Sequence, residues 1–157
     1  MSREAPTLLV FSDLDGSLLD HHSYSFAAAL PVVKILAQEE IPLVLASSKT
    51  RAEMLELRVA LGNTHPFIVE NGAAVFIPRH TFSAQPAGTR EQDSYWVYEM
   101  APPRSKWLAL LAQLATEFAG EFDSFHTAGV AGIVEMTGLS THEAQCANDR
   151  FYSEPVR

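Results

Sequence analysis

Cysteine is almost absent from this sequence, and long apolar runs are missing altogether. The one cysteine, Cys146, excludes an intramolecular disulfide and fits a reducing compartment. No apolar run approaches the roughly 20 residues of a membrane-spanning helix. The N-terminal residues also lack the apolar stretch of a secretory signal peptide. We therefore expect a cytoplasmic protein that has no membrane partner.

Positive charge is also scarce, since 11 lysines and arginines stand against 19 aspartates and glutamates, for a formal net charge of −8. This balance argues against non-specific binding to nucleic acid or to anionic membranes. It does not exclude an anionic substrate, because a local basic cluster or a metal ion can outweigh the global sign. Apolar residues make up 47% of the 157 residues, enough for a buried core in one domain, or in one domain and part of another.

The first half of the chain alternates between short apolar runs and amphipathic segments. We predict strands over Thr7–Phe11, Ile41–Ala46 and Phe67–Val69, and helices over Phe26–Glu40 and from Thr50 to Gly62. The second helix has the clearest ends, because Thr50 and Glu53 match a capping box and Gly62 suits a helix stop. The order strand, helix, strand, helix, strand predicts an α/β fold with a parallel sheet.

The second half changes character near Pro78. Residues 78–93 are rich in proline, glycine, serine, threonine and charge, as a linker or long loop would be. Around this segment we predict strands over Ala73–Ile77 and Tyr95–Met100, an amphipathic helix after Pro103, a short helix over Val130–Met136 and a helix capped by Ser140. The earlier of the two strands should form a hairpin with a later partner. We divide the chain into a sheet-based unit, residues 1–84, and a second unit, residues 85–157.

Two carboxylates, Asp13 and Asp15, follow the first predicted strand directly, on a turn closed by Gly16. In open α/β sheets, ligand crevices lie beyond the carboxyl ends of the strands. One aspartate there could attack phosphorus and form an aspartyl-phosphate, while the other protonates the leaving alcohol and later activates water. Oxygen ligands of this kind also suit Mg²⁺. The alternative is a simple turn, since Asp and Gly are common turn residues.

Two further polar segments follow the next two predicted strands. Ser47, Ser48 and Lys49 precede a helix N-terminus, where hydroxyls, free backbone N–H groups and a lysine can together hold a phosphate. Neighbouring parallel strands would bring this loop beside Asp13, although a polar loop with a solvated lysine is the alternative. Glu70 and Asn71 would border the same crevice, and a simple turn is again the alternative.

The string from Asp13 to Asp20, Asp-Leu-Asp-Gly-Ser-Leu-Leu-Asp, resembles the first motif of the haloacid dehalogenase (HAD) phosphatases. Ser17 stands where the family usually has threonine and keeps the hydroxyl. Leu43–Ser47 resembles the second motif, and Glu70–Ala73 resembles a segment of members with a large α/β (C2-type) cap. The resemblance implies a HAD-like Rossmannoid core in residues 1–84 and part of an α+β cap in residues 85–157.

Within that family, three segments are similar to the mannosyl-3-phosphoglycerate phosphatases. They are Ser-Ser-Lys-Thr-Arg-Ala-Glu at 47–53, Thr-Gly-Leu-Ser at 137–140 and Ser-Glu-Pro at 153–155. The implied reaction is hydrolysis of mannosyl-3-phosphoglycerate, a small phosphorylated sugar, to mannosylglycerate and phosphate. The product belongs among compatible solutes, which implies a role in osmolyte synthesis.

The resemblance also implies a role for each predicted site residue. Asp13 would be the nucleophile with one oxygen on Mg²⁺, and Asp15 the general acid and base, with its backbone carbonyl as a second metal ligand. Ser47 would bind the transferring phosphoryl group, and Lys49 would hold the phosphate or the glycerate carboxylate. The remaining candidates for phosphate or substrate binding are Gly16, Ser17, Ser48, Glu70 and Asn71.

Two motifs of the family have no counterpart after residue 90: the lysine of the third and the acidic residues of the fourth, which complete the Mg²⁺ site. We therefore expect a fragment of a longer protein, or a chain whose missing half comes from a separate chain or a homo-oligomer. One alternative function is that of a HAD phosphatase acting on another sugar phosphate. Another is an inactive fragment or binding module.

The cysteine and histidines give little sign of a further site. Cys146 has no basic neighbour to activate it, so we predict a semi-buried, unreactive residue of the last helix. His80, His126 and His142 show no metal-ligand spacing among themselves.

Overall fold

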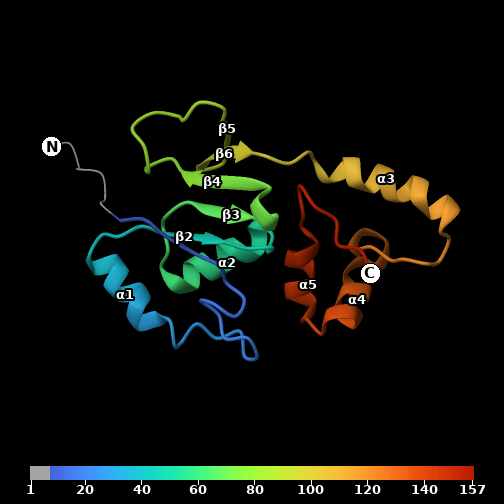
Figure 1. Ribbon diagram of the computed structural model, residues 1–157, viewed down its shortest axis with the longest axis horizontal. Coiled ribbons are helices and arrows are strands. Elements are labelled where there is room, and N and C mark those ends of the chain that lie inside the picture. The colour runs from blue at the N-terminus through green and yellow to red at the C-terminus, as the bar shows by residue number, and fades with distance from the viewer. Residues whose placement is uncertain (1–7) are drawn as a thin grey trace.

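A computed structural model of the chain describes residues 8–157, and the predicted strand residue Thr7 lies outside them. Six strands form one sheet in the order β1-β2-β3-β4-β6-β5 (Figure 1). They are β1 (Val10–Ser12), β2 (Leu43–Ala46), β3 (Phe67–Val69), β4 (Ala74–Pro78), β5 (Arg90–Gln92) and β6 (Tyr95–Glu99). The first three are parallel, and the other three continue the sheet in antiparallel pairs. The predicted α/β fold is confirmed.

Five α-helices and one 3₁₀ turn accompany the sheet in the described part of the chain. They are α1 (Leu30–Gln38), α2 (Arg51–Leu61), η1 (Glu70–Gly72), α3 (Arg104–Glu117), α4 (Phe125–Thr137) and α5 (Thr141–Asn148). Helix α2 has the predicted ends: Thr50 and Glu53 form the capping box, and Gly62 takes the left-handed conformation after the last turn. The prediction for α1 was too long at both ends, although Pro31 does lie in its first turn.

The core lies under the central strands and fixes the positions of their ends. Phe67 of β3 stacks on Phe76 of β4 with ring centroids 5.2 Å apart, and the two residues are also register partners. Arg58 of α2 is buried with its guanidinium 4.4 Å from the Phe67 ring and donates a hydrogen bond to the His65 carbonyl. A buried charge of this kind is tolerated because its donors have partners. The segments on either side of β3 are therefore held tightly.

The predicted loop over residues 78–93 is wrong at its end, where β5 forms. Arg-Glu-Gln at 90–92 has no apolar alternation, and its place in the sheet comes from pairing with β6, with Arg90 opposite Val97. Arg90 also makes two hydrogen bonds to Glu99. A strand stabilised by its partner in this way carries no pattern of its own. The hairpin expected between the fourth strand and a later one is confirmed by the pairing of β4 with β6.

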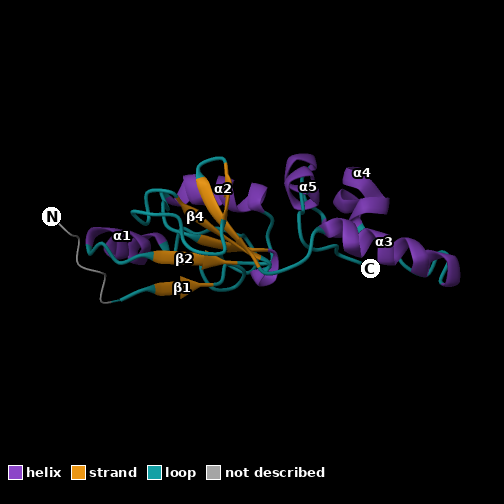
Figure 2. Ribbon diagram, turned by 90° about the horizontal axis from the view of Figure 1, so that it is seen from above, coloured by secondary structure: helices purple, strands orange, loops and turns teal. Residues whose placement is uncertain are grey.

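Residues 102–157, which we call the helical segment, lie beyond the carboxyl ends of the parallel strands (Figures 1 and 2). Helix α5 packs against α4 and against α2 of the sheet unit, whereas α3 has no buried residue. Helix α4 starts earlier than predicted because Ser124 caps it with Thr127, not Glu or Gln, at the third position. The division predicted at residue 84 falls between β4 and β5 of one sheet. Among the described residues, no helix is long and apolar enough to cross a membrane.

Candidate active site

Three loops meet at the carboxyl ends of β1, β2 and β3. Strands β1 and β2 run parallel in register, with Ser12 opposite Leu45, so the residues that follow them leave the sheet side by side. The loop after β3 is bonded to the loop after β2: Asn71 N donates to the Ser47 carbonyl and Glu70 N to the Lys49 carbonyl, both at 3.0 Å. The structure thus brings all three predicted polar segments to one edge of the sheet.

The turn after β1 holds both aspartates at the surface. Three backbone hydrogen bonds close it, from Gly16 to Leu19 and from Ser17 and Leu19 to Leu14. Gly16 has φ +72°, a left-handed conformation that a side chain would disfavour. Leu14 is fully buried and anchors the turn in the core. Asp13 and Asp15, on either side of this anchor, therefore stay exposed.

Lys49 supplies the positive charge nearest to this turn. Its Nζ lies 3.4 Å from Asp15 Oδ1, which is long for a hydrogen bond, and 5.6 Å from the centre of the Tyr24 ring. Ser47, which is buried, accepts a hydrogen bond on Oγ from Lys49 N at 3.2 Å. A buried hydroxyl, a cation and two exposed carboxylates form an arrangement that can bind and transfer a phosphoryl group.

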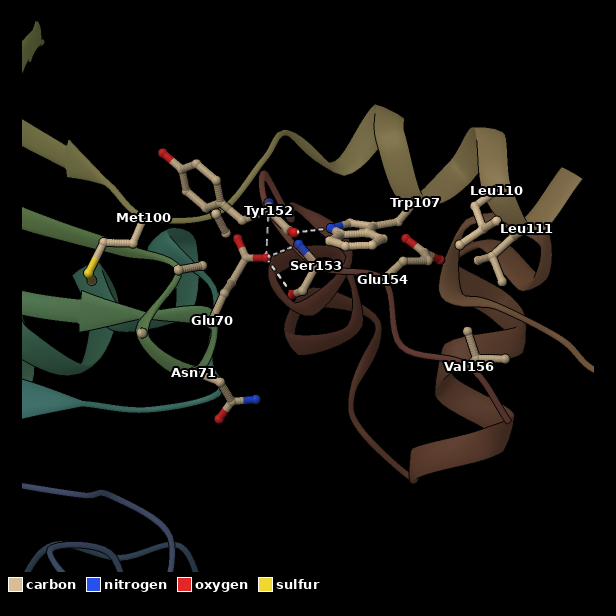
Figure 3. Close-up of a pocket in the computed structure, with 13 residues that line it drawn as sticks. Glu70, Asn71, Met100, Trp107, Leu110, Leu111, Tyr152, Ser153, Glu154 and Val156 are labelled. Carbon is tan, nitrogen blue, oxygen red and sulfur yellow. Dashed lines mark hydrogen bonds between the residues drawn. The ribbon is translucent and has the colours of Figure 1, made fainter.

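Glu70 occupies a different environment from the aspartates. Its side chain is fully buried, and its two oxygens accept hydrogen bonds from the backbone N–H groups of Phe151, Tyr152 and Ser153 at 2.8–3.1 Å. Figure 3 shows the contact with Tyr152 and Ser153. Ser153 Oγ donates a further bond at 2.6 Å, and Arg150 Nε lies 3.6 Å away. This carboxylate therefore connects residues 151–153 to the loop after β3.

The backbone at Glu70 and Asn71 has positive φ angles, which place the Glu70 carboxylate beside residues 151–153. Glu70 and Asn71 have φ values of +49° and +59°, a conformation that costs an L-residue about 1–2 kcal/mol. Such strain persists where the surroundings over-determine it. It turns the two side chains in opposite directions, so that Asn71 is exposed and points away from the Glu70 carboxylate (Figure 3).

Between the strand ends and the helical segment lies a depression of about 420 Å³. Its polar lining includes Ser48, Lys49, Asn71 and Arg150, and also the carboxylates of Glu53 and Glu154. Arg150 donates to the Ser48 carbonyl at 2.9 Å and to Ser153 Oγ at 3.0 Å. Burial lowers the pKa of Arg150, which nevertheless stays protonated at neutral pH because arginine titrates so high. The depression therefore has both basic and acidic groups beside the predicted phosphate loop.

Two residues of this site were missed in the sequence. Arg150 follows the last helix, and no local pattern distinguishes it from a solvated arginine; its only signal is its place before the Ser-Glu-Pro string. Tyr24 lies in a loop that Asp20 organises, accepting hydrogen bonds from the backbone of His22 and Ser23. These bonds lower the pKa of Asp20 and mark it as a loop anchor. An aromatic residue in that loop was the only hint of a contact with Lys49.

The Asp13 turn also has the oxygen ligands that a hard cation such as Mg²⁺ needs. Asp13 Oδ1 accepts one hydrogen bond, from Leu14 N at 2.7 Å, and within residues 8–157 no donor reaches its second oxygen. Asp15 has only the loose contact with Lys49 in the same part of the chain. Two carboxylates with few hydrogen bonds at an exposed turn fit Mg²⁺. This ion keeps several of its water ligands and binds a protein through one or two carboxylates.

This fold and this turn define a class. Residues 10–91 match the family of haloacid dehalogenase-like hydrolases, and the chain belongs to that family. It is 36% identical over 149 residues to the glucosyl-3-phosphoglycerate/mannosyl-3-phosphoglycerate phosphatase of Methanococcoides burtonii, and 32% identical over 148 residues to the protein of the same name from Persephonella marina. These alignments cover 95% and 94% of this chain but 55% and 54% of the relatives. The chain thus spans about half the length of these relatives.

Solved structures of low identity share the fold. A haloalkanoate-superfamily phosphatase from Bacteroides thetaiotaomicron aligns with a TM-score of 0.52 at 19% identity, over 79% of this chain and 41% of its own. A haloacid dehalogenase-like hydrolase from B. subtilis aligns with a TM-score of 0.51 at 18% identity, over 74% and 35%. At these identities the likeness shows the fold alone.

Proposed function

We propose that the protein is a phosphomonoesterase that hydrolyses mannosyl-3-phosphoglycerate, or its glucosyl counterpart, to the glycosylglycerate and phosphate. The observation that carries this proposal is the pair of exposed aspartates on one tight turn, with Lys49 3.4 Å from Asp15 and the Ser47 loop on the next strand. The names of the two relatives, which match almost the whole chain, supply the substrate class.

In the proposed reaction, an Asp13 carboxylate oxygen attacks phosphorus, and the bond between phosphorus and the glycerate oxygen breaks. Asp15 gives its proton to the departing alcohol. The resulting aspartyl-phosphate is then cleaved by a water molecule from which Asp15 takes a proton, which restores both carboxyl groups. Ser47 and Lys49 hold the phosphoryl oxygens in place during both steps.

Asp13 and Asp15 are the residues that would hold Mg²⁺, through a carboxylate oxygen of the first and the backbone carbonyl of the second. The ion, when bound, would neutralise charge on the phosphoryl oxygens. Lys49 and Arg150 would attract an anionic glycerate in the neighbouring depression, which Glu53 and Glu154 also line. We further propose a cytoplasmic enzyme of compatible-solute synthesis, with the helical segment as part of its cap and the boundary after β6.

The test is phosphate release by the full-length protein from a panel of phosphorylated sugars, with Mg²⁺ present and after chelation. We expect the mannosyl- and glucosyl-3-phosphoglycerates to give the highest kcat/KM, and chelation to abolish turnover. Equal or better turnover of an unrelated phosphosugar would contradict the proposed substrate. Turnover that survives chelation would contradict the metal requirement.

A further inference from the structure

Three potential metal ligands converge away from the Asp13 turn, where α5 meets α2. His142 Nε2 lies 2.6 Å from Glu56 Oε1, and Cys146 Sγ lies 3.7 Å from the same oxygen and 3.9 Å from the same nitrogen. The three ligand atoms all lie within 4.8 Å of one another. The chain separates Glu56 from His142 by 86 residues, which explains why histidine spacing alone gave no sign of the cluster.

The separations are close to those of a tetrahedral zinc site. Zinc bonds of about 2.0 Å to nitrogen and oxygen and about 2.3 Å to sulfur place pairs of ligand atoms about 3.3–3.6 Å apart. The two distances from Cys146 Sγ are slightly longer than this, and the distance from His142 to Glu56 is shorter. Glu56 and His142 are both more than half exposed, so small side-chain rotations can close both differences.

The backbone that carries these ligands is fixed on both sides. His142 and Cys146 are one helical turn apart and share a face of α5, which Ser140 and Glu143 cap. Helix α5 is anchored by its buried Ala144 and Ala147. On the α2 side, buried Thr50 donates a hydrogen bond from Oγ1 to the Cys146 carbonyl at 2.7 Å. The ligands thus start from rigid elements, which reduces the ordering that binding requires.

We propose that Glu56, His142 and Cys146 bind Zn²⁺ or a similar borderline-soft divalent cation, which joins α2 to α5, with water as the fourth ligand. Sulfur and imidazole ligands favour such an ion over the Mg²⁺ of the oxygen site. On binding, the Cys146 S–H proton passes to solvent as the sulfur–metal bond forms, and no electron is transferred. The ion would bridge the sheet unit and the helical segment.

A nucleophilic cysteine is a weaker explanation of the cluster. Burial, together with the negative charge of Glu56, raises the pKa of the Cys146 thiol. The proximity of His142 corrects the prediction that Cys146 has no basic neighbour, but its nitrogen is already in contact with Glu56. Reactive cysteines have the opposite property, a lowered thiol pKa.

The test uses Co²⁺ and Zn²⁺ on the metal-stripped protein, with excess Mg²⁺ to occupy the oxygen site. We expect one Co²⁺ per chain with a thiolate-to-cobalt absorption band, displaced by Zn²⁺. Replacing any ligand, as in Cys146→Ser, His142→Gln or Glu56→Gln, should weaken Zn²⁺ binding by more than about tenfold, because loss of even an outer partner of a ligand costs about 10–100-fold. His126→Gln and Glu135→Gln, exposed residues of α4 outside the cluster, are matched controls that should retain wild-type binding.

A second measurement separates loss of the site from loss of the fold. Zn²⁺ should slow labelling of the Cys146 thiol in the wild type and in both controls, but not in His142→Gln, where the thiol remains. The proposal is overturned if Zn²⁺ fails to protect the wild-type thiol, or if His142→Gln is protected as well as the wild type. A wild-type protein that binds Zn²⁺ no more tightly than Cys146→Ser does would show that His142 and Glu56 form only an ion pair.

Discussion

The loops after β1 and β3 both place an acidic side chain at the carboxyl end of a parallel strand, and the protein uses them in opposite ways. Within residues 8–157, Asp13 accepts one hydrogen bond, from its own neighbour Leu14, and stays exposed. Glu70 accepts four, all from residues 151–153, and is buried. Similar side chains at equivalent positions therefore differ: in the described part of the chain, one carboxylate is exposed with few partners and the other is buried with several.

The difference shows how to distinguish a reacting carboxylate from a structural one. A nucleophile needs an unengaged oxygen and access to the substrate. Asp13 is exposed, and among residues 8–157 no donor reaches one of its two oxygens. A carboxylate that accepts hydrogen bonds from several backbone N–H groups at once stabilises the fold, since it satisfies donors that would otherwise be buried without a partner. Glu70 fits this second description, and we propose that it positions the helical segment and does not contact substrate.

The largest expected effect is on turnover when the exposed carboxylate is changed. Asp13→Asn in the full-length protein should lower kcat by more than about 10⁴-fold, since loss of an attacking group can cost about 10⁶-fold. Asp15→Asn should cost about 10²–10⁴-fold, the usual contribution of a general acid or base. Steady-state phosphate release measures both, and Asp123→Asn, an exposed aspartate of the helical segment, is the control.

Retention of most activity in Asp13→Asn would contradict the proposed nucleophile. The contrast between a reacting Asp13 and a structural Glu70 would then be wrong. The thermal midpoint should stay close to that of the wild type in all three variants, because none of these side chains is buried. A variant that loses turnover because it unfolds gives no information about the catalytic step. The thermal midpoint is therefore measured together with phosphate release.

The next largest effect is on stability when the buried carboxylate is removed. Glu70→Ala should lower the free energy of unfolding by about 3–5 kcal/mol, because it leaves three backbone N–H groups without their acceptor and removes the buried carboxylate beside Arg150. Glu70→Gln should lose less, since its carbonyl oxygen can still accept. Urea denaturation measures both changes.

Asp15→Ala is the matched control for Glu70→Ala. Its ion pair with Lys49 is partly exposed, so its loss should change stability by less than about 1 kcal/mol. If Glu70→Ala and Asp15→Ala cost the same, the contrast between the two loops is wrong.

The sequence predicted the part of this contrast that depends on local pattern. Apolar runs located β2 and β3 closely, and the Thr50 capping box located the start of α2, because each signal lies within one element. The Asp13 turn was predicted for the same reason: its anchor Leu14 and its hinge Gly16 are neighbours in the chain.

The features that the sequence did not predict depend on residues that are far apart in the chain. The bonds of Glu70 join residues 81–83 positions apart, and nothing in Glu-Asn-Gly indicates an acceptor for a C-terminal segment. Strand β5 likewise depends on β6, and the ligand cluster on α5 depends on Glu56. Long-range pairing decides these features, and a single sequence carries no record of it.

A smaller effect tests whether the attachment of the helical segment also passes through α2. Thr50→Val removes both the cap of α2 and the bond to the Cys146 carbonyl, so it should cost about 2–3 kcal/mol of unfolding free energy. Ser140→Ala removes only the cap of α5, at an exposed position, and should cost about 1 kcal/mol. Urea denaturation of the two variants gives the comparison, and equal losses would mean that the Thr50 bond adds nothing.

The smallest effect is a dependence of stability on pH at Glu154. Burial alone would raise its pKa, but hydrogen bonds from Arg104 and from the backbone of His126 outweigh it, so the pKa lies below its ordinary 4.5. A depressed folded-state pKa gives stability that is present above the unfolded value and lost as pH falls through the folded one. Wild type should therefore lose stability relative to Glu154→Gln as pH is lowered from 6 toward and below 4.5, measured by urea midpoints. If the stabilities of the two proteins depend on pH in the same way, the charge of Glu154, unlike that of Glu70, does not stabilise the helical segment.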